Sequence, residues 1–136
     1  MTDLPNLLTA SSILLGVITA LYSLFFPAIK SVINIKPKKH KIDNKKDYLK
    51  SMEVVETKYI PLLIGSSIIS LIYIPELYSQ LKISFIIIRT NRFENISYDT
   101  LTASFIAVCF FMIFITIILI GTGFKLIKQI KALNPK

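Results

Sequence analysis

The chain has 136 residues, of which 53% are hydrophobic and 18% are charged, and its formal net charge is +8. A soluble domain of this size carries about 25% charged residues and does not gather its apolar residues into long blocks, so an ordinary soluble domain is excluded. Thirteen of the sixteen Lys and Arg residues lie in two segments, 30–58 and 125–136. Because the positive-inside rule places basic residues in cytoplasmic loops, we expect a membrane protein that binds no nucleic acid.

Three apolar blocks are long enough to cross a membrane, near residues 7–29, 59–78 and 101–124. At about 1.5 Å per helical residue each reaches roughly 30 to 36 Å, and the hydrocarbon core of a bilayer is about 30 Å thick. No water is present there to satisfy backbone polar groups, so each block must be helical. The sequence predicts an all-α integral membrane protein with three transmembrane helices in a single membrane domain, residues 1–136.

The first block has no Lys or Arg before Lys30. It therefore lacks the basic start of a secretory signal peptide, and we expect a retained span with its N-terminus outside. Ser12, Gly16 and Ala20 are four residues apart, and small residues at this spacing let another helix backbone approach closely. We predict a helix-packing face here, whose partner is either another span of the chain or another subunit.

The segment 30–58 is predicted to be a cytoplasmic loop. Each basic residue held near an anionic membrane surface contributes about 1 kcal/mol to binding. Two interpretations stay open: the lysines only orient the chain, or they also bind anionic lipid or an acidic partner. The six lysines at the centre of this prediction are Lys36, Lys38, Lys39, Lys41, Lys45 and Lys46.

The second half of this loop has a helical pattern. Tyr48, Met52, Val55 and Tyr59 recur at spacings of four, three and four residues, which predicts a short amphipathic cytoplasmic helix before the second span. Its apolar side would lie on the membrane surface or against the cytoplasmic ends of the other helices.

The second span contains further small residues. Gly65 and Ser66 lie near its middle, and Ser66 and Ser70 share one side of the helix. Serine hydroxyls inside a membrane bond to their own helix backbone or across to a neighbouring helix. We predict that these three residues are packing positions.

The segment 77–88 is ambiguous. Its seven apolar residues favour membrane insertion by about 2 to 4 kcal/mol in total, and the central Lys82 opposes it by about 2.5 to 3.5 kcal/mol. Twelve helical residues cover only about 18 Å, which is too short to span. We predict an interfacial helix or strand on the outer face, within an outer loop 79–100, and a re-entrant segment stays open as an alternative.

The third span has no charged residue between positions 101 and 124. Ala103 and Ala107 offer a narrow packing side. We expect the helix to continue beyond Gly121 and Gly123 into the basic tail 125–136, which the positive-inside rule places in the cytoplasm.

Chemical motifs are sparse. The spans contain no Asp, Lys, Arg or His in their interiors, which argues against an ion-coupled transporter. Glu76, at the outer end of the second span, is interpreted as a surface carboxylate. The chain has one histidine and one cysteine, and no nucleophile elbow, P-loop or dinucleotide motif. We expect no enzyme activity, no cofactor, no metal site and no small-molecule substrate.

These observations favour a small, multi-pass protein of a bacterial inner membrane that acts through helix-helix contacts. It would be an accessory, immunity or inhibitory subunit of another membrane protein, or a homo-oligomer. The alternative is a self-assembling pore or holin-like permeabiliser, because some holins also have three spans and a basic tail. Such a pore would be lined by the hydroxyl-bearing residues of the first two spans, Thr9, Ser12, Thr19, Ser23, Ser66, Ser67 and Ser70.

Overall fold

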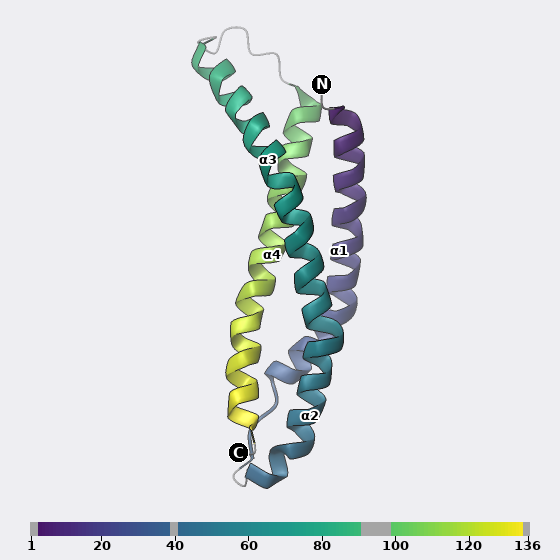
Figure 1. Cartoon of the computed structure of the whole chain (residues 1–136), viewed down its shortest axis with the longest axis vertical. Coiled ribbons are helices and arrows are strands. Elements are labelled where there is room, and N and C mark those ends of the chain that lie inside the picture. The colour runs from purple at the N-terminus through teal and green to yellow at the C-terminus, as the bar shows by residue number, and fades with distance from the viewer. Residues whose placement is uncertain (1–2, 39–40, 91–98, 135–136) are drawn as a thin grey trace.

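The computed structural model describes residues 3–38, 41–90 and 99–134, and all the regular structure in these ranges is helical. Three long apolar helices lie side by side in an elongated bundle (Figure 1), and each is long and apolar enough to cross a membrane. The expected all-α chain with three candidate spans is thereby confirmed, and it indicates a multi-pass membrane protein. The elements are α1 (Leu4–Ile33), a 3-10 turn (Lys41–Asn44), α2 (Lys45–Val54), a π turn (Val55–Tyr59), α3 (Ile60–Thr90) and α4 (Thr100–Leu133).

α4 is the helix that the other two share. α1 and α4 begin at the same end of the bundle and run parallel, whereas α3 runs in the opposite direction (Figure 1). α4 contacts both α1 and α3 extensively, and these two contact each other far less. The bundle is therefore two helix pairs that have α4 in common.

The inner side of α4 carries a regular repeat. Its buried residues are spaced alternately by four and three positions, which is the spacing of a coiled-coil seam with a left-handed supercoil. We call this set the α4 seam, and it consists of Phe105, Cys109, Met112, Thr116, Leu119, Gly123 and Leu126. One core cluster joins Leu119 and Leu126 to Ile29 and Val32 of α1, and a second joins Phe105 and Met112 to Tyr73 and Leu77 of α3.

α2 leads directly into α3 through the π turn. Val54 and Tyr59 are both buried although they are five residues apart, and one wide turn of π-helix allows both to face the bundle. In an α-helix, the residue four after Val54, Lys58, would face inward instead. The turn also precedes Pro61, which has no amide hydrogen to donate to the carbonyl of Thr57. α2 packs against α1 and α4, so a helix does lie where the sequence predicted one.

α3 is longer than the predicted second span. It continues through Pro75 and beyond Tyr78 to Thr90 without interruption, so the segment 77–88 is neither a strand nor a separate element. Most of the predicted outer loop 79–100 is thereby helical, and residues 91–98 lie outside the described ranges. Beyond Leu77 the helix leaves the other two (Figure 1), and we call residues 78–89 the α3 arm.

The ends of α4 are fixed by polar contacts. Asp99 caps the N-terminus by accepting a hydrogen bond from the amide of Leu101 at 3.1 Å. A hydrogen bond from the Thr102 hydroxyl lowers the pKa of the Asp99 carboxyl. The helix passes through both glycines as expected and ends at Leu133, and Gln129 donates a hydrogen bond to the carbonyl of Ile35. The basic tail is thus an extension of α4 that holds the loop after α1.

Tyr59 crosses to α4 and lies against Gly123. Its hydroxyl donates a hydrogen bond of 2.9 Å to the carbonyl of Leu119, and its ring lies against Gly123. A Cβ atom on Gly123 would collide with the Tyr59 hydroxyl oxygen. Gly121, two residues earlier, faces open space. Gly123 is therefore required for this contact and Gly121 is not.

We predict that Gly123→Ala destabilises the folded protein by about 1 to 3 kcal/mol, the usual cost of overpacking. Tyr59→Phe removes the colliding oxygen, so the cost of Gly123→Ala should be smaller in that background, although Tyr59→Phe alone loses a hydrogen bond worth about 0.6 kcal/mol or more. The measurement is unfolding in detergent of the two single variants and the double variant. Gly121→Ala is the matched control and should change stability by less than about 0.5 kcal/mol. Equal costs at the two glycines would contradict the assignment.

Candidate functional site

Ser66 and Ser70 form the polar contact between α3 and α4 together with Thr116. The Ser70 and Thr116 hydroxyl oxygens are 2.8 Å apart, and Thr116 also lies 3.0 Å from the carbonyl oxygen of Met112 and 3.3 Å from that of Ser66. Thr116 has one hydrogen to donate and two carbonyls to accept it, so Ser70 is best placed to donate to Thr116. Ser66 donates to the carbonyl of Leu63 in its own helix. The predicted packing role of these serines thus has a partner within the chain.

The other predicted packing residues of α3 and α4, Gly65, Ala103 and Ala107, are less buried than Ser66 and Ser70. Gly65 is half-buried, and no atom lies within 4 Å of the position of its Cβ. Ala103 is half-buried, whereas Ala107 is exposed. Ala107 lines a shallow apolar hollow with Phe110, Phe111 and Phe114, on the side of α4 opposite the seam. This side of α4 is suited to contact with lipid.

The predicted packing residues of α1, Ser12, Gly16 and Ala20, face away from the bundle. α1 packs on α4 through residues such as Ser11, Ile18 and Ile29, all of which are buried. At about 100° per residue the predicted packing residues fall on the other side of the helix. All of them are exposed, and a Cβ on Gly16 would meet no atom within 4 Å. We call this side the α1 outer face; it consists of Thr9, Ser12, Gly16, Ala20, Ser23 and Pro27.

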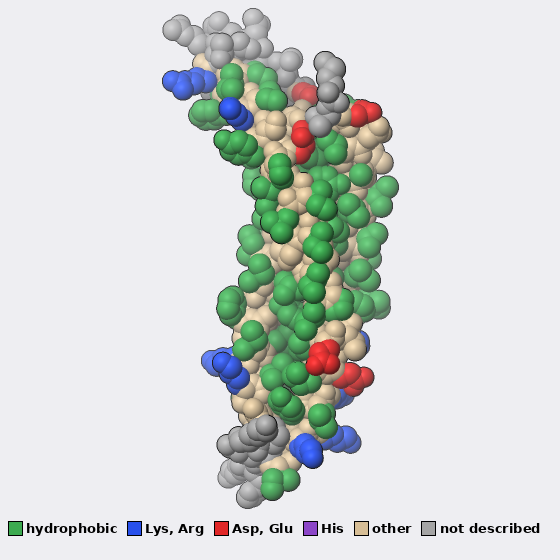
Figure 2. Space-filling model, viewed as in Figure 1, with side chains coloured by type: hydrophobic (Ala, Val, Ile, Leu, Met, Phe, Trp, Pro, Cys, Tyr) green, Lys and Arg blue, Asp and Glu red, His purple; other side chains and the backbone are tan. Residues whose placement is uncertain are grey.

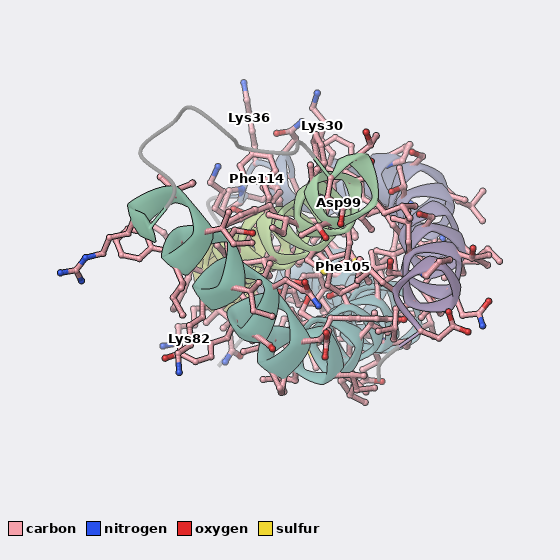
Figure 3. All side chains as sticks on the ribbon, turned by 90° about the horizontal axis from the view of Figure 1, so that it is seen from above. Lys30, Lys36, Lys82, Asp99, Phe105 and Phe114 are labelled. Atoms are coloured by element: carbon pink, nitrogen blue, oxygen red, sulfur yellow. The ribbon has the colours of Figure 1, made fainter. Side chains whose placement is uncertain are left out.

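The lysine-rich segment forms one end of the molecule. Asn44 is buried and holds the loop by accepting a hydrogen bond from the amide of Lys38 at 2.8 Å and donating one to its carbonyl. Lys38 also pairs with Asp47 at 3.6 Å. Lys36, Lys45 and Lys46 are exposed, and Figure 3 shows Lys30 and Lys36 projecting away from the ribbon. Lys39 lies outside the described residues, and only the backbone of Lys41 is described.

No reactive centre is assembled in the described part of the chain. Within residues 3–38, 41–90 and 99–134, no three His, Cys, Asp or Glu side chains are grouped so as to hold a metal ion. Glu76 is half-buried and accepts a hydrogen bond of 2.8 Å from the Gln80 amide, and Cys109 is buried in the α4 seam. The candidate functional surfaces are the α1 outer face and the basic end.

Sequence reasoning missed the role of Tyr59. It placed Tyr59 in an apolar stripe, whereas the side chain donates a hydrogen bond to the backbone of α4. Gly123 in the apolar third span was the available signal, because a glycine within a helix indicates a close approach by a neighbour. Its partner was not identifiable from the sequence alone.

Comparisons of the chain with models of protein families, with curated proteins and with solved structures found no match.

The Ser70 and Thr116 hydroxyls should be energetically coupled. We predict that Ser70→Ala and Thr116→Val each destabilise the protein, and that the double variant loses less than the sum of the two. The expected coupling is about 0.6 kcal/mol and at most about 1.7 kcal/mol, the range for hydrogen bonds between membrane helices. Unfolding of all four proteins in one detergent measures it. Strict additivity would show that the 2.8 Å contact contributes no stability.

Proposed function

We propose that the protein is a non-enzymatic subunit of a bacterial inner membrane that binds another membrane protein through the α1 outer face. It would serve as an accessory, immunity or inhibitory subunit. The observation that carries the proposal is that α1 packs on α4 without using the small residues of its outer face, which remain exposed along the helix. Membrane helices associate through close packing at small residues, so a second protein's helix is the partner that this face fits.

The proposal includes an orientation with the N-terminus outside and the C-terminus in the cytoplasm. Asp3 and Asp99 lie at one end of the bundle, because α1 and α4 begin there. Lys30, Lys58 and Lys125 lie toward the other end. Figure 2 shows Lys and Arg side chains at both ends of the face in view, and those at the Asp3 and Asp99 end lie on the α3 arm. The positive-inside rule assigns the lysine-rich end, including α2, to the cytoplasm. There the exposed lysines would also attract anionic lipid headgroups.

The orientation predicts which positions a membrane-impermeant maleimide can reach in intact cells. Asp3→Cys should be labelled without permeabilisation, and Lys36→Cys only after it. Both positions are exposed, so the difference would report the side of the membrane. The native chain is the baseline, because its single cysteine, Cys109, is 2% exposed. Labelling of Lys36→Cys alone in intact cells would reverse the proposed orientation.

Docking through the α1 outer face predicts that Gly16→Leu weakens association with the partner. A leucine side chain there would hold the two backbones apart, and we expect the fraction co-purified in mild detergent to fall by about tenfold, equivalent to about 1.4 kcal/mol. Gly121→Leu is the matched control, because Gly121 is an exposed helical glycine with open space around it on a different helix. Insertion of both variants is checked by membrane fractionation. Equal co-purification of the two variants would refute the proposal.

The alternative is a self-assembling pore, and one observation favours it. The exposed sides of α1 carry the hydroxyls of Thr9, Ser12, Thr19 and Ser23, which copies arranged around an axis could turn toward a water-filled channel. Thr9 and Thr19 at present bond to carbonyls of their own helix. Native mass separates the two functions. A closed homo-oligomer that releases dye from vesicles would be a pore, and a stoichiometric complex with a second protein would be the proposed subunit.

A further inference from the structure

α1 and α4 define the thickness of the membrane-spanning part. No charged side chain lies between Asp3 and Lys30 or between Asp99 and Lys125. At about 1.5 Å per residue each uncharged run is about 38 Å long, enough to cross the hydrocarbon core and enter both headgroup layers. The two runs are parallel and packed together, so they describe the same layer.

α3 is too long for this layer if it stands parallel to the other helices. Counted along the helix from Lys58, at the lysine-rich end, α3 reaches a length of about 38 Å near Ile83. The rest of the arm would then project into water. Yet this part of the arm is apolar: Phe85 is 67% exposed, and Ile86, Ile87 and Ile88 are between 42% and 52% exposed. A large apolar side chain in water forgoes about 1.5 to 3 kcal/mol of burial, so lipid or protein must cover this part.

The two cations of the arm share one side of the helix, and two of its isoleucines lie on the other. Tyr78, Lys82, Phe85 and Arg89 follow one another at spacings of four, three and four residues and therefore share one side of the helix. Ile83 and Ile87 lie on the opposite side. Figure 3 shows the Lys82 side chain directed away from the bundle. Among the described residues the salt bridge joins Lys38 to Asp47, so Lys82 and Arg89 have no acidic partner there.

We infer that the α3 arm lies in the headgroup layer at the Asp3 and Asp99 end, where Lys82 and Arg89 bind phospholipid phosphate groups. α3 contains Pro75, and its C-terminal part slants away from α1 and α4 (Figure 1), so the arm reaches sideways into the headgroup layer at this end. Ile83 and Ile87 then lie among the acyl chains, as the apolar side of an interfacial helix does. The long stems of Lys82 and Arg89 carry their charges to the phosphates. This inference needs the three spans but does not depend on docking by α1.

Depth measurements test the position of the arm. The chain has no tryptophan, so a single tryptophan reports its own depth when lipids spin-labelled at known depths quench its emission. In vesicles of phosphatidylcholine and phosphatidylglycerol, Tyr78→Trp and Phe85→Trp should be equally shallow, and Ile87→Trp deeper. A helix parallel to α1 would instead separate positions 78 and 85 by about 10 Å. Such a separation, or the absence of quenching at all three positions, would overturn the inference.

Lipid selectivity tests the phosphate contact. Energy transfer from the Phe85→Trp variant to pyrene-labelled phosphatidylglycerol is compared with transfer to a pyrene-labelled galactolipid that has the same acyl chains and no phosphate. We expect at least about a threefold preference for the phospholipid, because each cation near an anionic lipid surface favours binding. Adding Lys82→Gln and Arg89→Gln should abolish the preference. Adding Lys45→Gln and Lys46→Gln, which neutralises exposed lysines at the other end, should preserve it. A preference that survives loss of Lys82 and Arg89, or is absent from the start, would refute the phosphate contact.

Discussion

The structure depends on the close packing of α1 and α3 against the α4 seam. In lipid, apolar side chains gain little by leaving one apolar surface for another, so helices are held together by van der Waals packing and hydrogen bonds. The heptad spacing of the seam supplies the packing over seven successive positions from Phe105 to Leu126. Two hydrogen-bonded contacts, from Tyr59 to Leu119 and between Ser70 and Thr116, fix the register of α3 on the same helix. Loss of the seam would therefore release both neighbours at once.

Small residues serve three different purposes in this bundle. Gly123 allows the Tyr59 ring to reach a backbone carbonyl, whereas Gly121 faces open space only two positions away. Ser66 and Ser70 lie where α3 and α4 meet, and their size permits a polar contact between the two helices. A Cβ on Gly16 would meet no other helix within the described residues. The small residues of the α1 outer face do not pack within the bundle, and this is why α1 is the proposed docking helix.

The sequence predicted the number and composition of the long helices, because an uncharged apolar run of seventeen residues or more permits few other structures. It also predicted the continuation of α4 through its two glycines. It could not assign the end of α3, since the insertion energies of Lys82 and its apolar neighbours nearly cancel. The structure shows that the helix continues to Thr90. The π turn could not be predicted from the sequence either. It places Tyr59 instead of Lys58 against the bundle, and this placement depends on the contacts between helices. Periodicity identified the side of α1 that carries Gly16 but not which neighbour that side faces.

The departure of α3 from α4 has a cause in the residues that follow Leu77. Up to Leu77 the side of α3 that faces α4 is apolar or small, as at Ser70 and Tyr73. The same side continues with the polar residues Gln80 and Ser84, whose hydrogen bonds are made within α3. Gln80 donates to the carboxylate of Glu76, and Ser84 donates to the carbonyl of Gln80. No apolar seam remains to hold the arm against α4, and Pro75 has already removed one hydrogen bond of the helix. The helix therefore separates where its seam ends, and this separation gives Lys82 and Arg89 access to the headgroup layer.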